Sequence, residues 1–279
     1  MPATLDLKLP SGALRAHRFG AEADRLTLCI HGLSANSRSF DFIAESLASP
    51  TSTVVAIDLR GRGWSDITPP GTYGWANHAQ DVVATADALG ASTFDYIGHS
   101  MGAFIGLELA RLAPERIRKL VLIDAIGVPE AAALLSISAS IQRLGTKHAN
   151  ADAYVAAMRA MGHIEQWNDY WEAYYRYELV PSPDGGVTPR TDRAAVFEDA
   201  VYGSTQRPNS YWPAITMDAL LLRAARPLGA GYIVTAHDRD QFLASVARSS
   251  AVDIDANHYG IVTHQATADN VRRFLARPT

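Results

Sequence analysis

The hydrophobic and polar positions follow two patterns in the first half of the chain. Residues 4–9 and 13–19 are short β-rich runs on either side of the turn Pro10-Ser11-Gly12, which predicts an antiparallel hairpin. Four later runs are mostly continuous in apolar residues: 25–31, 52–58, 94–100 and 119–125. Because the stretches between these runs are long enough for a helix each, the pattern predicts an α/β fold, with a mostly parallel sheet covered on both faces by helices.

This alternation stops after the fourth run. From about Ile126 to Pro227 the sequence predicts successive helices rich in tyrosine and tryptophan and no convincing strand, so we assign residues 127–227 to an inserted helical cap. The sheet pattern resumes with a strand at 229–238, a helix at 239–248, a strand at 250–255 and a closing helix at 267–276. Residues 1–126 and 228–279 are therefore expected to form one core domain around the cap.

The charge and the cysteine content of the chain exclude several classes of function. The chain of 279 residues has 25 basic and 29 acidic side chains, so no global positive field would attract nucleic acid or an anionic membrane. Cys29 is the single cysteine, which excludes an intramolecular disulfide and a cysteine-based metal cluster. The N-terminus does not resemble a secretion signal, and the longest apolar runs, 120–128 and 131–141, are too short to span a bilayer. We expect a cytoplasmic protein.

The most informative motif is Gly98-His99-Ser100-Met101-Gly102, between a predicted strand and a predicted helix. A serine at such a sharp turn has a strained backbone, and side chains at the flanking glycines would collide with their neighbours. The turn exposes the Ser100 hydroxyl at the N-terminus of a helix, where developing negative charge is favoured. Ser100 is therefore a candidate nucleophile.

A serine nucleophile needs a histidine to accept its proton and a carboxylate to orient that histidine. His258 follows the last predicted strand, and loops at the carboxyl ends of parallel strands meet at one edge of a sheet. His264 is a weaker candidate for the same role. Asp238 and Asp124 each end a predicted strand, and both give the chain order serine, acid, histidine. We favour Asp238 and keep Asp124 as the alternative acid.

Serine attack on a carbonyl produces an oxyanion that needs two preorganised donors. The backbone N–H of Met101, directly after the serine, would be one of them. The other is expected from Leu33, because Gly32 lets the chain turn after the strand that ends at His31.

Together these segments resemble the α/β-hydrolase superfamily. Residues 29–33 resemble its oxyanion turn, 56–66 the loop after the next strand, 98–102 its nucleophile elbow, 120–124 the strand before the cap, 235–238 its acid loop and 257–258 its histidine loop. Some family members use an acid at the strand end equivalent to Asp124. The resemblance implies an α/β-hydrolase fold and a serine hydrolase that cleaves a carboxylic ester or lactone of a small apolar substrate through an acyl-enzyme.

The same resemblance leaves other functions open. A hydrolase of carbon–carbon bonds in diketone-like substrates is the main alternative, and a cofactor-free oxygenase or a non-catalytic ligand-binding relative is less favoured. Cap tryptophans Trp167, Trp171 and Trp212 are candidates for the apolar wall of the substrate pocket. The loop at Gly61 and Gly63 lacks the third glycine of a dinucleotide site, and no metal-binding motif occurs, so we expect neither cofactor nor metal.

Overall fold

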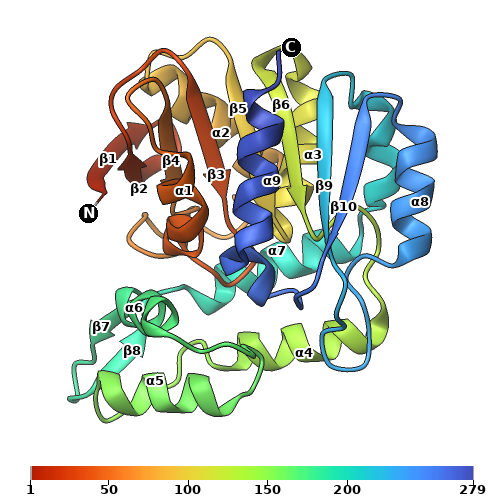
Figure 1. Ribbon diagram of the computed structural model, residues 1–279. Coiled ribbons are helices and arrows are strands. Elements are labelled where there is room, and N and C mark those ends of the chain that lie inside the picture. Colours follow the sequence, from red (N-terminus) through yellow and green to blue (C-terminus); the bar gives the residue numbers. More distant parts are fainter. Residues whose placement is uncertain (1, 279) are drawn as a thin grey trace.

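The computed structural model describes residues 2–278 and places one large sheet at the centre of the molecule (Figure 1). Its eight strands lie in the order β1-β2-β4-β3-β5-β6-β9-β10. Their bounds are β1 Ala3–Leu9, β2 Gly12–Phe19, β3 Leu26–Ile30, β4 Thr53–Ile57, β5 Phe94–His99, β6 Ile117–Ile123, β9 Asp218–Ala224 and β10 Ser249–Ile254. The strands of the hairpin β1–β2 pair antiparallel, and β2 also runs antiparallel to β4. The other six strands of this sheet, β4, β3, β5, β6, β9 and β10, are parallel to one another. The predicted hairpin and parallel sheet are confirmed.

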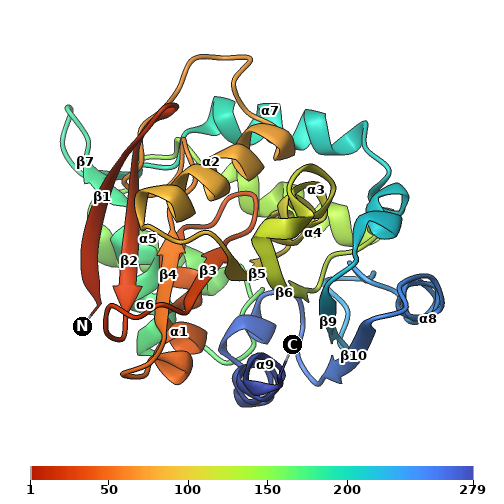
Figure 2. The same cartoon turned by 90° about the horizontal axis from the view of Figure 1, so that it is seen from above.

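Helices cover both faces of this sheet, as Figure 2 shows from above. The α-helices are α1 Asp41–Leu47, α2 Trp75–Ala88, α3 Met101–Leu112, α4 Ala131–Gln142, α5 Ala151–Ala160, α6 Asp169–Tyr177, α7 Arg193–Ser204, α8 Ala236–Ser245 and α9 Gln265–Ala276. Helices α1 and α9 bury their apolar residues against one face, and α2, α3 and α8 bury theirs against the other. Because both faces are covered, every residue of β3, β4 and β5 is buried, which explains their uninterrupted apolar runs.

The insertion between β6 and β9 lies over the carboxyl end of the sheet (Figure 1). It contains α4 to α7, the short 3₁₀ helix Pro208–Ala214, and a small hairpin of β7 Leu179–Pro181 and β8 Val187–Pro189 that the sequence did not predict. These elements form the wall above the strand ends from which catalytic side chains are expected.

The predicted boundary of the cap at residue 227 is wrong, because β9 lies inside the predicted cap and pairs with β6 and β10. Residues 229–238, predicted as a strand, form a loop and the first turn of α8. The run Ala219-Leu220-Leu221-Leu222 consists of residues with high helix propensity, so its composition favoured a helix while its burial in the sheet makes it a strand.

The cap is tied to the core by a buried ionic cluster. Asp199 on α7 lies 2.7 Å from the Arg62 guanidinium and 2.9 Å from His78 Nε2, and it also accepts the Gly74 N–H at 2.6 Å. The side chains of Arg62, His78 and Asp199 are fully buried. Burial would raise the pKa of the Asp199 carboxyl, but the neighbouring His78 and Arg62 outweigh it and lower that pKa to about 2.

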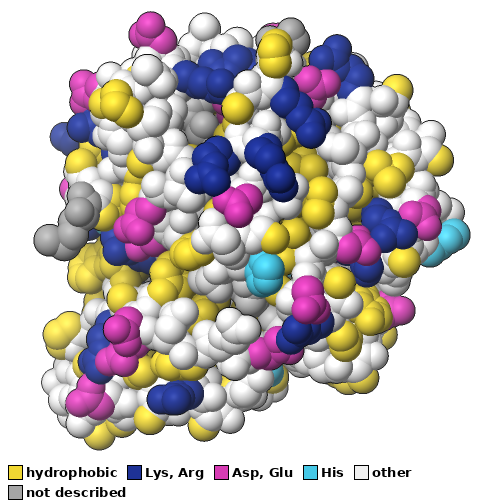
Figure 3. Space-filling model, in the orientation of Figure 1, with side chains coloured by type: hydrophobic (Ala, Val, Ile, Leu, Met, Phe, Trp, Pro, Cys, Tyr) yellow, Lys and Arg dark blue, Asp and Glu magenta, His cyan; other side chains and the backbone are white. Residues whose placement is uncertain are grey.

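The surface carries both signs of charge. Basic and acidic side chains are interleaved over the face seen in Figure 3, with small hydrophobic areas between them. Among the described residues, no helix is both long and apolar enough to cross a membrane.

Candidate active site

Ser100 occupies the sharp turn between β5 and α3, with a left-handed φ of 55°. The two flanking glycines are required by close packing. A Cβ at Gly98 would lie 2.2 Å from the Gly102 carbonyl oxygen, and a Cβ at Gly102 would lie 2.0 Å from the Ile30 carbonyl oxygen. The turn is held to the sheet because the Ser100 N–H donates to the Ile123 carbonyl at 3.0 Å. The turn that carries Ser100 is thus fixed by backbone contacts on both sides.

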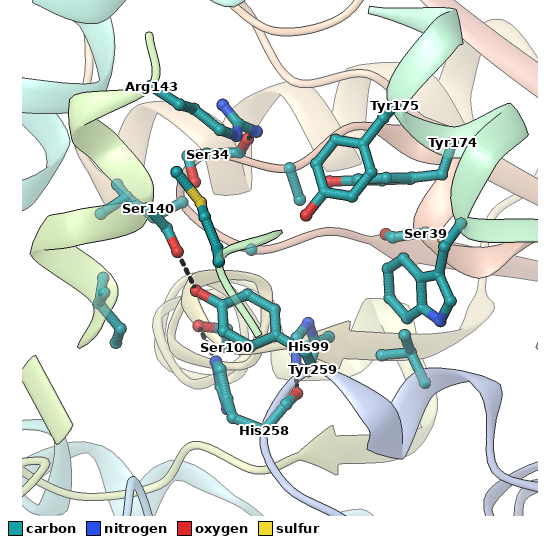
Figure 4. Close-up of a pocket in the computed structure, with 17 residues that line it drawn as sticks. Ser34, Ser39, His99, Ser100, Ser140, Arg143, Tyr174, Tyr175, His258 and Tyr259 are labelled. Carbon is teal, nitrogen blue, oxygen red and sulfur yellow. Dashed lines mark hydrogen bonds between the residues drawn. The ribbon is translucent and has the colours of Figure 1, made fainter. Parts of the chain in front are cut away.

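His258, in the loop after β10, faces Ser100 (Figure 4). Its Nε2 lies 3.0 Å from Ser100 Oγ, and its Nδ1 lies 2.8 Å from a carboxylate oxygen of Asp124. The His258 carbonyl accepts a hydrogen bond at 3.0 Å from Nε2 of His99, the residue before the serine. The carboxylate defines the tautomer: Nδ1 carries the proton, and the lone pair of Nε2 points at the serine hydroxyl.

Asp124 directly follows β6 and is held as firmly as the serine. Its backbone has a left-handed φ of 49°, and Ser100 and Asp124 are the two non-glycine residues with positive φ in the described part of the chain. The second carboxylate oxygen accepts the Ala224 N–H of β9 at 2.9 Å. Each oxygen therefore has a fixed partner, and the side chain cannot rotate away from His258.

The preference for Asp238 over Asp124 as partner of the histidine is wrong. Asp238 lies in the first turn of α8 and forms a capping box: its carboxylate accepts the Thr235 N–H at 3.2 Å and the Thr235 hydroxyl at 2.6 Å, and its own N–H donates to Thr235 Oγ1 at 3.0 Å. Because β9 ends at Ala224, Asp238 is not at a strand end. Its carboxylate stabilises the start of a helix instead.

The turn after β3 brings the predicted oxyanion donors next to the serine. Glycine at position 32 leaves room there, since a Cβ would lie 3.1 Å from Ser100 Cβ. The N–H groups of Leu33 and Met101 have no hydrogen-bond partner within residues 2–278, so both are free to bind a ligand oxygen.

His31 holds this turn in place through two hydrogen bonds. Its Nε2 accepts the Leu59 N–H at 3.0 Å, so its Nδ1 carries the proton and donates to the Gly32 carbonyl at 2.8 Å. Burial lowers the pKa of His31 to about 4, which keeps the ring neutral in this role. The neutral imidazole thus fixes the carbonyl of the residue that precedes the Leu33 N–H.

Ser100 and His258 open into a cavity of about 60 Å³ between the sheet edge and the cap (Figure 4). Its lining is largely aromatic and apolar, with contributions from Ile137, Met161, Trp171, Tyr174, Tyr175 and Tyr259. Of the three tryptophans expected there, Trp171 lines the cavity. Trp167 instead stacks on Tyr175 with ring centroids 5.6 Å apart, and Trp212 is buried in the core, where its indole donates to the Ile126 carbonyl at 2.9 Å.

Among the polar residues of this cavity that were not singled out from the sequence are two, a histidine and an arginine, that each have a polar atom without a hydrogen-bond partner in the described part of the chain. His99 has a buried Nδ1 without a hydrogen-bond partner among the described residues, and a Cβ at Gly32 would lie 3.7 Å from it. Burial and the nearby His258 lower the pKa of His99 well below its usual value, so this Nδ1 is a hydrogen-bond acceptor. Arg143, just after α4, is the other. The motif could have drawn attention to His99, but no local pattern indicates Arg143.

The described residues contain no group of three histidine, cysteine or carboxylate side chains arranged to hold a metal ion. The polar groups that reach the cavity suit an organic substrate with a carbonyl group.

Comparisons with known proteins agree with this geometry. The family model described as alpha/beta hydrolase fold matches residues 27–157. A serine hydrolase-like protein from Danio rerio is 34% identical over 122 residues, covering 43% of this chain and 37% of that protein. A 2-hydroxymuconate semialdehyde hydrolase from Pseudomonas putida is 37% identical over 102 residues, covering 36% of each chain. The matched segments thus span well under half of these relatives.

Solved structures match over the whole length. The crystal structure of E-2-(acetamidomethylene)succinate hydrolase superposes with a TM-score of 0.87 over 99% of this chain and 100% of the other, at 21% identity. At this identity the likeness concerns the fold alone.

Proposed function

We propose that this chain, whose residues 27–157 match the α/β-hydrolase family model and whose fold is that of an α/β-hydrolase, is a serine hydrolase that cleaves a carboxylic ester or lactone through an acyl-enzyme. One observation carries the proposal: Ser100, His258 and Asp124 form a continuous hydrogen-bonded chain that opens into a cavity. This order of nucleophile, base and carboxylate is the arrangement that activates a serine hydroxyl.

The reaction follows from the contacts. His258 Nε2 accepts the Ser100 proton while Oγ attacks the substrate carbonyl carbon, and Asp124 stabilises the resulting imidazolium. The tetrahedral intermediate collapses, the bond to the leaving alcohol breaks, and His258 returns its proton to that alcohol. Water, deprotonated by His258, then attacks the acyl-enzyme and releases the carboxylic acid and free Ser100.

The oxyanion of both tetrahedral intermediates would bind to the N–H groups of Leu33 and Met101. Both donors are fixed before substrate arrives, Leu33 by the turn on His31 and Met101 as the first residue of α3. Preorganised donors of this kind matter because losing one typically costs about 3 kcal/mol of transition-state stabilisation.

The proposal is tested with a fluorophosphonate probe and a panel of p-nitrophenyl esters and lactones. The probe should label the wild type at Ser100, and Ser100→Ala should remain unlabelled and lose about 10⁴- to 10⁶-fold in kcat. Near-normal turnover of Ser100→Ala, or labelling at another residue, would refute the assignment.

Cleavage of a carbon–carbon bond in a diketone-like substrate is the second candidate. It is favoured by the similarity to a protein named 2-hydroxymuconate semialdehyde hydrolase. The same triad could serve both reactions, since both need a base and an oxyanion site beside a carbonyl. Including vinylogous diketones in the panel distinguishes ester hydrolysis from carbon–carbon bond hydrolysis. A carbon–carbon hydrolase should have a higher kcat/KM for these diketones than for every ester and lactone tested.

A further inference from the structure

Arg143 places a buried cation in the proposed active site. It follows α4, its side chain reaches the cavity wall above Ser100 (Figure 4), and it is only 6% exposed. Its Nη2 donates to the Ser34 carbonyl at 2.8 Å. Its Nη1, also buried, has no hydrogen-bond partner within residues 2–278. A buried guanidinium with an unused donor is unusual, because each unsatisfied polar group of this kind destabilises the fold.

Glu178 is the counter-ion of Arg143, but it does not use the guanidinium fully. Their closest approach is 3.3 Å, longer than the roughly 2.7–2.9 Å of a strong charge-assisted hydrogen bond. The Glu178 carboxylate also accepts hydrogen bonds from the hydroxyls of Tyr154 and Thr191. A pair serving only to hold the cap would be expected to engage both guanidinium nitrogens in parallel bonds, and this pair leaves Nη1 free.

Arg143 lies close to the place where the substrate carbonyl is proposed to bind. Ser34, which accepts its hydrogen bond, directly follows Leu33, the proposed oxyanion donor. The guanidinium also lies 6.0 Å from the ring centre of Tyr175, which lines the same cavity. A group bound to Arg143 would therefore lie a short chain away from the scissile carbonyl, in surroundings where charge interactions are strengthened.

Resting on the proposed esterase function, we propose that Arg143 binds a carboxylate of the substrate, so that the preferred substrates are monoesters of short dicarboxylic acids. A planar carboxylate matches the donor geometry of arginine. A phosphate dianion fits less well, because it would add two negative charges beside Glu178 in a buried site. The small cavity, about 60 Å³, favours a chain of few carbons between ester and acid.

The first test needs no variant. Hydrolysis of monomethyl glutarate is compared with that of methyl pentanoate, an uncharged ester of similar length, in a pH-stat at pH 7.5. The wild type should prefer the charged ester by about 10- to 100-fold in kcat/KM, the range given by one hydrogen bond to a charged group. Equal rates, or a preference for methyl pentanoate, would overturn the proposal while leaving esterase activity established.

Substitutions test whether Arg143 itself binds the substrate carboxylate. Arg143→Met and Arg143→Lys should both reduce the ratio of the two kcat/KM values, mainly through KM of the monoester. Glu178→Gln should instead lower that KM, because it removes the competing negative charge. If Arg143 only held the cap in place, both esters would suffer alike and Glu178→Gln would resemble Arg143→Met. Arg159→Met, on the exposed side of cap helix α5, serves as the matched control and should keep the wild-type ratio.

Failure of the proposed function is recognised separately. A wild type that neither reacts with fluorophosphonate nor cleaves either ester refutes the esterase, and the anion site is then judged by binding alone. Millimolar glutarate should raise the Tm of the wild type and of Ser100→Ala but not of Arg143→Met. No shift in Ser100→Ala would overturn the carboxylate site.

Discussion

At the scale of single residues, backbone strain is concentrated at the candidate active site. Ser100 and Asp124 are the two described non-glycine residues with left-handed backbones, and each follows a parallel strand of the central sheet. Such conformations persist only where surrounding contacts fix them, and here those contacts aim both side chains at His258. Local backbone strain therefore accompanies the hydrogen-bonded chain of Ser100, His258 and Asp124.

The assignment of the acid gives the sharpest prediction at this scale. Asp124→Asn should reduce kcat by about 10⁴-fold with little change in fold, because an amide stabilises the wrong tautomer of His258 and cannot stabilise the imidazolium. Asp238→Asn changes a helix cap whose hydrogen bonds go to Thr235, so kcat should stay within a few-fold of the wild type. Steady-state kinetics of both variants on one p-nitrophenyl ester decide the matter: the opposite ranking would restore Asp238 as the acid.

The proximity of Ser100 and His258 could be predicted from the sequence, whereas the carboxylate that contacts the histidine could not be chosen. The serine lies in a five-residue motif whose glycines are dictated locally, and the histidine follows a short strand that was identified correctly. The acid depends on which strand ends beside the histidine. Since both carboxylates satisfied the chain order, only the true position of β9 shows that Asp238 belongs to a helix.

At the scale of elements, the elbow depends on how closely α3 approaches the neighbouring strand β3. Gly102 is the contact point, since a Cβ there would lie 2.0 Å from the Ile30 carbonyl oxygen. This distance is far inside van der Waals contact, and backbone atoms in a central strand cannot move aside cheaply. Gly102 thus sets the spacing between helix and sheet.

We expect Gly102→Ala to push α3 away from β3, with a loss of about 2 kcal/mol or more in unfolding free energy and a large loss of activity. Gly127→Ala is the matched control, because its new Cβ would meet Asp238 at an ordinary 3.6 Å. Urea unfolding and ester turnover of the two variants are the measurements. Wild-type stability in Gly102→Ala would show that the helix has more freedom than the packing indicates.

Strands could be predicted from the sequence where burial on both faces requires a continuous run of apolar residues. The strands β3 to β6 are covered on both faces, so their apolar runs were recognised from the sequence. The cap offers no such regularity, because its helices pack on one another and on the sheet edge through aromatic side chains. Its hairpin β7–β8 has three residues in each strand, too few for a period to be detected.

At the scale of the whole molecule, the cap must stay fixed over the sheet for the cavity to exist. The cluster of Arg62, His78 and Asp199 provides one tie, joining the loop after β4 and helix α2 to cap helix α7. Its residues are far apart in sequence, and nothing in the local pattern around any of them indicates the others. Such long-range ion pairs are the part of the fold that sequence periodicity cannot supply.

The ionic cluster of Arg62, His78 and Asp199 predicts how the free energy of unfolding depends on pH. The pKa of Asp199 falls from 3.8 to about 2 on folding, so its contribution is fully present above about pH 5 and is lost as the pH falls toward 2. A shift of this size corresponds to about 2 kcal/mol. Asp199→Asn removes the titrating group and leaves Arg62 without its counter-ion, so we expect a loss of about 3 kcal/mol or more at pH 7.

The difference in unfolding free energy between the wild type and Asp199→Asn should therefore shrink by about 2 kcal/mol between pH 5 and pH 2. Urea unfolding at intervals across this range measures it, and subtraction cancels the titration of every carboxylate that the two proteins share. Asp184→Asn, at an exposed position in the β7–β8 turn, should show no such pH dependence. A constant difference for Asp199→Asn would mean that the cap is held to the core by apolar packing rather than by this ionic cluster.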